Sequence, residues 1–279
     1  MTHAEQAPRA TAADPEERPL LGAALVAGTA NVIMQLAHPA VGYGVVESPV
    51  KSGSIMHSPA KRTRTTLTYL AVAMRGTDEQ RRAYRKAVNR SHAQVRSGPS
   101  SPVAYNAFDP RLQLWVAACL YKGVEDAHAA FVGDLDDQTR DELYAGAATL
   151  GTTLQVPEEM WPRDREAFEE YWQQGLEQIH IDDTVREFLL ALVGMRFAHT
   201  PVRVLFGRFH RFMTIGFLPP RFRQEMRLPW APRQQRRFER VLAVMRAIVQ
   251  RQPRVVKEFP FNLYLRDVDR RIRKGIPLV

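Results

Sequence analysis

The chain has 279 residues, 45% of them hydrophobic, and a formal net charge of +9. This length allows a sizeable core in one large domain or two small ones. The single cysteine, Cys119, excludes an internal disulfide and a Cys-x-x-Cys metal framework within one chain, and it fits a reducing compartment. Basic residues are spread along the chain without a nucleic-acid-binding motif, so we expect no nucleic acid partner.

The N-terminal part divides into a polar leader and an uncharged segment. Residues 1–18 predict a mobile tail, and residues 19–279 predict one all-helical domain. Residues 19–46 carry no formal charge and would be long enough to span a membrane. However, Asn31, Gln35 and His38 share one helical stripe, which Gly28 extends, so we predict a buried helix from about Leu20 to Ala37. Its small residues allow close approach of a flat ligand or of another helix.

His38 precedes a proline and should end this helix. Its role is then a helix cap, with a distal group or a second metal ligand as alternatives. Glu47 follows in a short connection, where an isolated glutamate is either an ordinary surface residue or part of a site.

Two helices at about residues 59–74 and 78–95 carry the strongest pattern. The first places Arg62, Thr66 and Tyr69 on one face, so that a cation, a hydroxyl and a phenol point the same way. The second places His92 on an apolar stripe together with Val95. A buried imidazole needs a partner, which is a metal, a carboxylate or a backbone carbonyl.

The next helix, at about residues 110–131, should start at Asp109 as N-cap with Pro110 in its first turn. It contains a Glu-x-x-His pair, Glu125 and His128. A di-iron bundle needs two such pairs together with further carboxylates, so this pair alone does not define a di-iron site. Further helices are expected at about residues 136–150, 163–179, 183–197, 202–215 and 234–250.

The later chain has two basic regions. Arg208, His210 and Arg211 form either an exposed helix face or a rim that attracts carboxylates or membrane phosphates. The basic tail 251–279 either packs on the core or touches a membrane. No segment alternates with period two, which predicts an all-α fold, and hydrolase, Rossmann, P-loop and zincin motifs are absent from the sequence.

Several of these residues follow one another in a recognisable order. In chain order, the motifs are Gln35 to Val41, Glu47-Ser48, Arg62-x-x-x-Thr66-Leu67, His92, Tyr105-x-x-x-Asp109-Pro110 and Leu114-Trp115-Val116. From about Leu20 to Gln250 the chain resembles the catalytic domain of the latex-clearing protein (rubber oxygenase) and ER-bound mycophenolic acid oxygenase family.

The resemblance implies a single multi-helix orthogonal bundle that encloses a pocket for non-covalent haem b. His92 matches the proximal haem ligand of the rubber oxygenases, Arg62 and Thr66 match the arginine and threonine that precede that ligand, and Glu47 matches a glutamate proposed as a base. Asn31, Gly28 and His38 are expected beside the cofactor. The rubber oxygenases have a lysine where this chain has Thr65. The resemblance therefore supports haem binding by this chain better than it supports any particular reaction.

These observations predict a haem b-dependent oxygenase that acts with dioxygen on a small hydrophobic substrate, for example an isoprenoid. Cleavage of a carbon–carbon double bond, hydroxylation and dehydrogenation all fit, and the electron donor is unknown. The alternatives are a haem-free helical binding protein at a membrane surface and a di-iron helical oxidase. We expect a cytoplasmic protein, with peripheral membrane contact left open.

Overall fold

The computed structural model describes residues 21–133 and 135–279, and the predicted tail at 1–18 lies outside them. In these ranges the only β pairing is an isolated bridge between Arg96 and Asn106, which confirms the all-α prediction. In chain order, the 3-10 helices (η) and α-helices are η2 (Gly22–Ala27), α1 (Gly28–Leu36), α2 (Pro39–Val46), η3 (Lys51–Gly53), α3 (Pro59–Arg75), α4 (Asp78–His92), α5 (Pro110–Phe131), α6 (Asp137–Ala147), α7 (Thr149–Thr152), η4 (Glu158–Met160), α8 (Arg165–Gln178), α9 (Asp183–Val193), α10 (Thr200–Phe217), α11 (Pro220–Glu225), α12 (Pro232–Gln250), α13 (Arg254–Lys257) and α14 (Phe261–Lys274).

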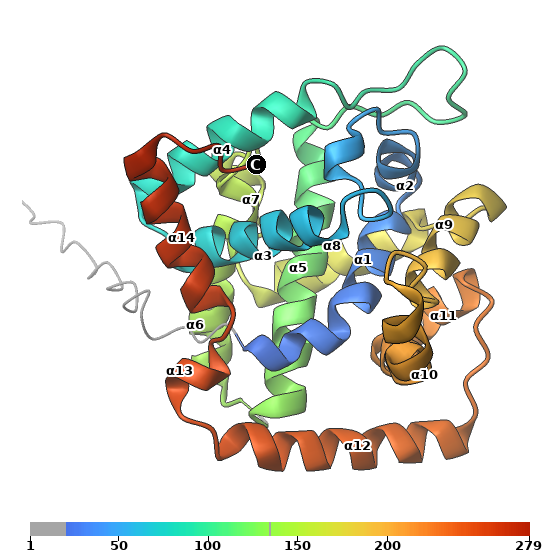
Figure 1. The fold of residues 1–279 in the computed structure, drawn as a ribbon. Helices are drawn as coiled ribbons and strands as arrows, with labels where there is room; N and C mark the ends of the chain where they lie inside the picture. Colours follow the sequence, from blue (N-terminus) through green and yellow to red (C-terminus); the bar gives the residue numbers. More distant parts are fainter. Residues whose placement is uncertain (1–20, 134) are drawn as a thin grey trace, which may run out of the picture.

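Helix α5 is the central element, and α1, α7, α12 and η2 pack against it (Figure 1). Its start is as predicted: the Asp109 carboxylate accepts the backbone N–H of Arg111 at 2.9 Å, and Pro110 stands where a missing N–H costs nothing. On its side wall, Trp115 stacks on Trp172 of α8, with ring centroids 5.2 Å apart. The cap and the aromatic contact fix where α5 begins and which face it turns to α8.

The segment before α2 differs from the prediction of one helix over residues 20–37. Its first part is a 3-10 helix, and only Gly28–Leu36 is α-helical. A Cβ at Gly22 would lie 1.8 Å from the carbonyl oxygen of Phe259, so the C-terminal backbone packs directly on this glycine. Because Pro39 disfavours helical backbone before it, His38 is extended (ψ 120°). The chain direction bends by 110° between the segments Gly22–Leu36 and Pro39–Val46.

No single helix of the described chain is long and apolar enough to cross a membrane; the bent pair Gly22–Leu36 and Pro39–Val46 meets that test only when both parts are taken together.

The C-terminal segment packs on the core through α14, which packs against α3 (Figure 1). Val268 is buried between them, and the Gln80 amide at the start of α4 donates to Asp269 at 2.6 Å. At the other end of this contact, Arg75 pairs with Glu258 at 2.9 Å. The tail therefore holds α3 and α4 in place, which is one of the two arrangements that the sequence left open for residues 251–279.

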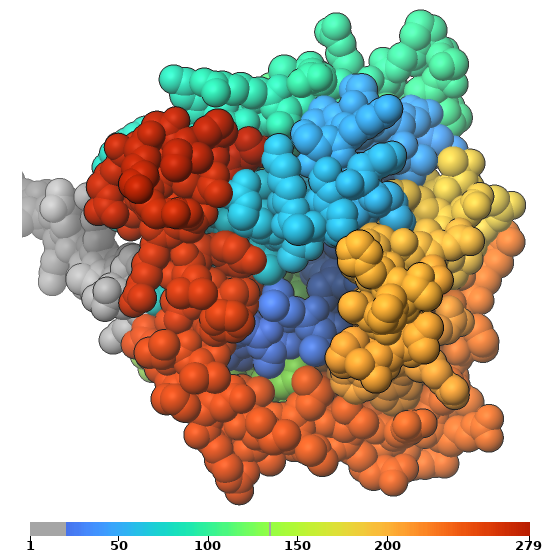
Figure 2. Space-filling model, viewed as in Figure 1, coloured from blue at the N-terminus to red at the C-terminus, as the bar shows by residue number. Residues whose placement is uncertain are grey.

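One face of the molecule is hollowed (Figure 2). We call this concavity the hollow: it is bounded by α3, by η2 and α1, by α10, and by the segment of α13 and α14. Residues far apart in sequence thus meet around one opening.

Candidate functional site

Helix α3 presents the predicted polar face. Arg62, Thr66 and Tyr69 lie at i, i+4 and i+7 of a continuous helix, and the phenol of Tyr69 donates to the carbonyl of Leu150 at 2.5 Å. Burial raises the pKa of Tyr69 above its usual range, so it remains a neutral phenol at physiological pH. Tyr69 is therefore fixed to α7, while Arg62 and Thr66 keep their functional groups for other contacts.

Arg62 combines two properties that rarely occur together. Its side chain is exposed, yet burial lowers the pKa of its guanidinium. Both fit a group that protein surrounds on most sides while the space next to it stays open. α3, which carries it, forms one side of the hollow (Figure 2).

His92 is the last residue of α4, which starts at a capping box of Thr77 and Gln80. Its Nδ1 is enclosed and finds no hydrogen-bond partner among the described residues. Burial, and after it the positive charge of Arg62, lowers the pKa of His92 to about 4. The ring packs edge-on against Phe108, with centroids 6.3 Å apart. The structure thus brings His92 and Arg62 into one environment, in which the imidazole is neutral.

The helix ends at His92, so the prediction that it runs to Val95 on one stripe is wrong. Val95 instead accepts the backbone N–H of Ala107 at 2.9 Å in the loop that leads to α5. This loop pairing stops the helix and places Phe108 beside the imidazole.

A stripe of the central helix borders open space. Val116, Leu120 and Val124, spaced by four residues on α5, are only half-buried although the helix runs through the middle of the bundle. Their neighbours Trp115 and Cys119 are buried. We infer that this apolar stripe lines the inner part of the same concavity that Arg62 enters.

Glu47 does not join this pair in the described structure. It ends α2 and accepts the Tyr105 hydroxyl at 2.9 Å, and its carboxylate is not among the charges that shift the pKa of Arg62 or His92. Burial, with Glu47 as second cause, raises the pKa of Tyr105 to about 12. The predicted catalytic role of Glu47 stays a prediction, and its observed contact is to Tyr105.

His38 is not a C-cap of the preceding helix, as the sequence suggested, because α1 ends two residues earlier; it stands at the N-cap position of α2. Its ring lies 6.2 Å from that of Trp115, and its Nδ1 is enclosed without a partner in the described part of the chain. Burial lowers its pKa, and the carboxylate of Asp109 partly offsets this effect. The charge of Asp109 thus acts on His38, and the ring of Phe108 packs against His92, so both histidines are linked to residues just before α5.

Asn31 and Gly28 occupy different positions on α1. The Asn31 amide donates to the carbonyl of Cys119 at 2.6 Å and accepts from Gln35 at 2.7 Å, so it joins α1 to α5. At Gly28 a Cβ would meet no described atom within 4 Å, apart from its own helix and chain neighbours. Gly28 thus borders open space, as a residue beside a ligand would, whereas Asn31 is engaged in helix packing.

A polar network that the sequence did not reveal supports the end of α4. The Gln155 amide donates to Asn89 at 2.7 Å and its carbonyl accepts from Gln113 at 2.6 Å, and the Gln113 amide also donates to the carbonyl of Ala107. The network joins α4, α5 and the loop between them one turn from His92. Its members are far apart in sequence and match no motif, so only the fold reveals it.

The basic cluster of α10 is divided between two environments. Arg208 and Arg211 are exposed, but His210 points inward: its Nε2 lies 2.9 Å from the Thr29 hydroxyl and its Nδ1 lies 3.1 Å from the carbonyl of Val193. His210 therefore ties α10 to α1 and is not free to bind an anion.

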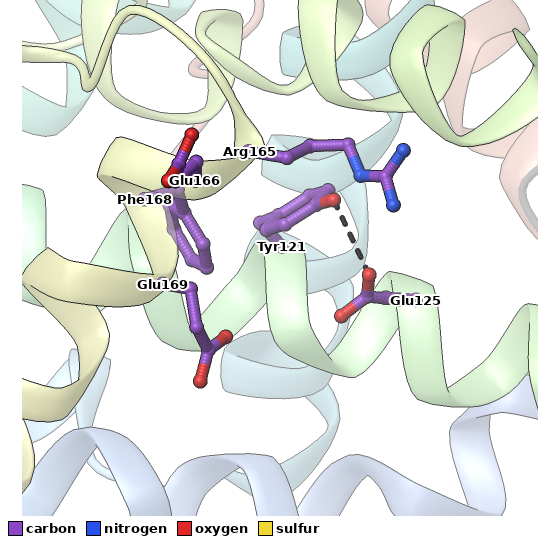
Figure 3. Close-up of a pocket in the computed structure, with 6 residues that line it drawn as sticks. All are labelled: Tyr121, Glu125, Arg165, Glu166, Phe168 and Glu169. Atoms are coloured by element: carbon purple, nitrogen blue, oxygen red, sulfur yellow. Dashed lines mark hydrogen bonds between the residues drawn. The ribbon is translucent and has the colours of Figure 1, made fainter. Parts of the chain in front are cut away.

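A separate pocket of about 440 Å³ lies between α5 and α8 and contains no predicted cofactor residue (Figure 3). Glu125 accepts the Tyr121 hydroxyl at 3.4 Å there and pairs with Lys122 at 2.6 Å. Among residues 21–133 and 135–279, no group of three or more His, Cys, Asp or Glu side chains is placed to hold a metal ion. The di-iron alternative therefore has no ligand set in this part of the chain, whereas a haem iron needs only one protein ligand.

Comparison with known proteins agrees with the order of motifs. Two relatives are uncharacterized proteins of Mycobacterium bovis and Mycobacterium tuberculosis; each is 53% identical over 250 residues, which cover 90% of this chain and 98% of the relative. No solved structure matches the chain. Residues 20–247 match a family of oxygenase catalytic domains, which makes the protein an enzyme of the oxidoreductase kind. The chain belongs to the family described as ER-bound oxygenase mpaB/B'/rubber oxygenase, catalytic domain.

Proposed function

We propose that the protein is a haem b-dependent oxygenase for a small hydrophobic organic substrate, with His92 as the axial protein ligand. The observation that carries the proposal is the enclosed, unpartnered imidazole of His92 next to Arg62 at the edge of a concavity, as far as the described residues extend. An enclosed ring nitrogen without a hydrogen bond is unfavourable, and a ligated iron would relieve that cost.

The protonation state of His92 suits this role. Imidazole binds a metal only through an unprotonated nitrogen, and a pKa of about 4 leaves the ring neutral across the physiological range. Binding therefore requires no deprotonation near pH 7.

Arg62 and Thr66 would serve the same pocket from α3. An arginine that stays charged in a concavity attracts a carboxylate such as a haem propionate, or donates hydrogen bonds to a polar group of the bound substrate. The Thr66 hydroxyl, one turn further on, adds a donor on the same face. The half-buried stripe of Val116, Leu120 and Val124 offers an apolar wall that excludes water and suits a hydrocarbon substrate.

Bound haem would supply the iron for dioxygen chemistry, which none of these side chains can perform alone. The residues named here hold and orient the reactants. Because they contact the substrate chiefly through apolar surface, double-bond cleavage, hydroxylation and dehydrogenation are equally compatible with them.

Haem binding is tested by titrating purified protein with haemin and following the Soret band. We expect a saturable spectrum at one haem per chain that survives dialysis. His92→Gly should abolish the ligated spectrum, and added imidazole should restore it by filling the vacated position. His57→Gly, at an exposed histidine, is the matched control and should bind haem like the parent protein.

Three results would contradict the proposal. Colourless protein that refuses haemin would favour the haem-free binding protein. A native spectrum in His92→Gly would move the ligand elsewhere, with His38→Gly as the next variant. Two irons per chain without porphyrin would favour the di-iron alternative.

A further inference from the structure

The N-terminal half of α10 is exposed and carries large apolar side chains. Val204 is 74%, Leu205 72% and Phe206 52% exposed, and one turn later Phe209 is 47% exposed. The helix is anchored only through its second half, where Met213 is buried. Soluble monomers rarely expose a contiguous apolar patch of this kind unless something covers it.

A second exposed apolar region lies near the opposite side of the hollow. Val255 is 70% and Phe259 56% exposed in and just after α13, and Leu25 of η2 is 42% exposed between this region and α10. η2 packs against both α10 and α13, so the three segments are neighbours around one opening (Figure 2). We call this surface, formed by Leu25, residues 202–209 and residues 255–259, the apolar rim.

The charges beside the apolar rim have one sign. Between Glu187 and Glu225 the chain has six arginines and no carboxylate, and between Glu239 and Glu258 it has four arginines, one lysine and no carboxylate. Arg203 and Arg208 are exposed on α10 among the apolar side chains themselves. Glu258, the acid within the rim segments, is buried and already paired with Arg75 and Arg254.

We propose that the apolar rim docks on an anionic lipid bilayer, with Leu205, Phe206 and Phe209 inserted below the headgroups and Arg203 and Arg208 at the lipid phosphates. Apolar side chains interleaved with cations are what such an interface requires. A second copy of the chain is a poorer occupant, because a two-fold contact would bring the same unpaired arginines together. A nucleic acid would contact the arginines but not the exposed aromatic and aliphatic groups.

Docking would turn the mouth of the hollow toward the membrane. If the substrate is hydrophobic, as proposed above, it then enters from the bilayer without crossing water. This last step rests on the proposed function, whereas vesicle binding by the rim does not.

The test is co-sedimentation of the full protein with two kinds of vesicle: phosphatidylcholine alone, and phosphatidylcholine with roughly 30% phosphatidylglycerol. On an anionic surface of this kind, each protein cation near the lipid phosphates should raise the binding constant about fivefold. The parent protein should pellet with the anionic vesicles and less with the neutral ones. Leu205→Ser/Phe206→Ser should weaken partitioning by about tenfold or more. Arg203→Glu/Arg208→Glu should weaken it by at least about 25-fold on anionic vesicles only.

Matched controls change the same residue types elsewhere. Val132→Ser/Leu190→Ser alters exposed apolar residues that are not part of the rim, and Arg85→Glu/Lys86→Glu alters exposed cations on α4; both should bind vesicles like the parent protein. Haemin titration of every variant should stay unchanged, which separates a failure of docking from a failure of haem binding.

The proposal is overturned if the parent protein stays in the supernatant with both vesicle types, or if the controls lose as much binding as the rim variants. It is also overturned if Leu205→Ser/Phe206→Ser merely dissociates a dimer in sedimentation velocity. A further contrary result is that an oligonucleotide of roughly 30 nucleotides, about the length that single-stranded-binding proteins cover, displaces the protein from vesicles through the rim arginines.

Discussion

The guanidinium of Arg62 and the imidazole of His92 belong to successive helices, yet the charge of the first helps to lower the pKa of the second to about 4. Burial is the larger cause and Arg62 the smaller one. Arg62→Gln should therefore raise the pKa of His92 while leaving it below 6.5, since burial remains. Histidine ring titration by NMR measures this shift.

The control for this experiment is Arg64→Gln on the same helix. Arg64 donates to the carbonyl of Leu278 at 3.3 Å and its charge acts on Tyr84, not on His92. The pKa of His92 should stay unchanged in this variant. Equal shifts in both variants would mean that the effect comes from net charge and that Arg62 does not face the ring.

The low pKa of His92 also makes stability depend on pH. Between pH 6.5 and about pH 4 the unfolded chain binds a proton at this histidine and the folded chain does not, so the free energy of unfolding should fall as the pH falls through this window. The loss attributable to His92 is at most about 3 kcal/mol. Urea unfolding at pH 7, 5.5 and 4 measures it.

His92→Gln should flatten this dependence, because the variant has no group to protonate there. His38 and His210, whose pKa values burial also lowers, will retain part of the slope. His57→Gln, an exposed substitution, should leave the slope as it is. An unchanged slope in His92→Gln would show that the ring is not buried in the folded protein.

Local rules predicted some elements well and others poorly. The start of α5 followed from Asp109-Pro110, because a carboxylate cap and an N1 proline act within one turn. The close packing of η2 at Gly22 did not, because its partner Phe259 is far along the chain. Helical spacing likewise grouped Arg62 with Thr66, which lie on one helix. The approach of His92 to Arg62 was expected only from the family resemblance. The Asn89–Gln155–Gln113 network was missed, because its members are far apart in sequence.

Glu47 offers a test between a catalytic and a structural role. Its carboxylate accepts the Tyr105 hydroxyl and contributes to raising the pKa of Tyr105 to about 12. In Glu47→Gln this pKa should fall, but not to 10, since burial is the larger cause. Ultraviolet titration of the variant, with Tyr105→Phe subtracted, measures the shift.

Substrate turnover then separates the two roles. If Glu47 acts as a base, Glu47→Gln should lose about 100-fold or more in rate while Tyr105→Phe loses little. If its role is to hold Tyr105, both variants should lose the same small factor. The second pattern would remove Glu47 from the proposed catalytic residues.

Asn31 should act through helix packing. A Cβ at Gly123 would lie 2.3 Å from Asn31 Nδ2, which is held by its bond to the Cys119 carbonyl. Gly123→Ala should thus displace Asn31 and destabilise the fold by about 1–2 kcal/mol. In a double-mutant cycle, Asn31→Ala should remove most of this added cost. Haemin affinity that falls in Asn31→Ala beyond the loss of folded protein would restore its predicted cofactor role.

Gly28 allows the predicted cofactor contact to be tested with little effect on folding. No described atom beyond its own helix would meet a Cβ within 4 Å, and its φ of −56° suits any residue. Gly28→Ala should be as stable as the parent protein or up to about 1 kcal/mol more stable, because alanine favours the helix. Gly28→Leu should also fold, as judged by its urea midpoint.

If the cofactor lies against α1, the leucine at position 28 will occupy its space and weaken haemin binding at least about tenfold, whereas alanine will have a small effect. Equal haemin affinity in the leucine variant would place the cofactor away from Gly28 and leave this open surface to the substrate path.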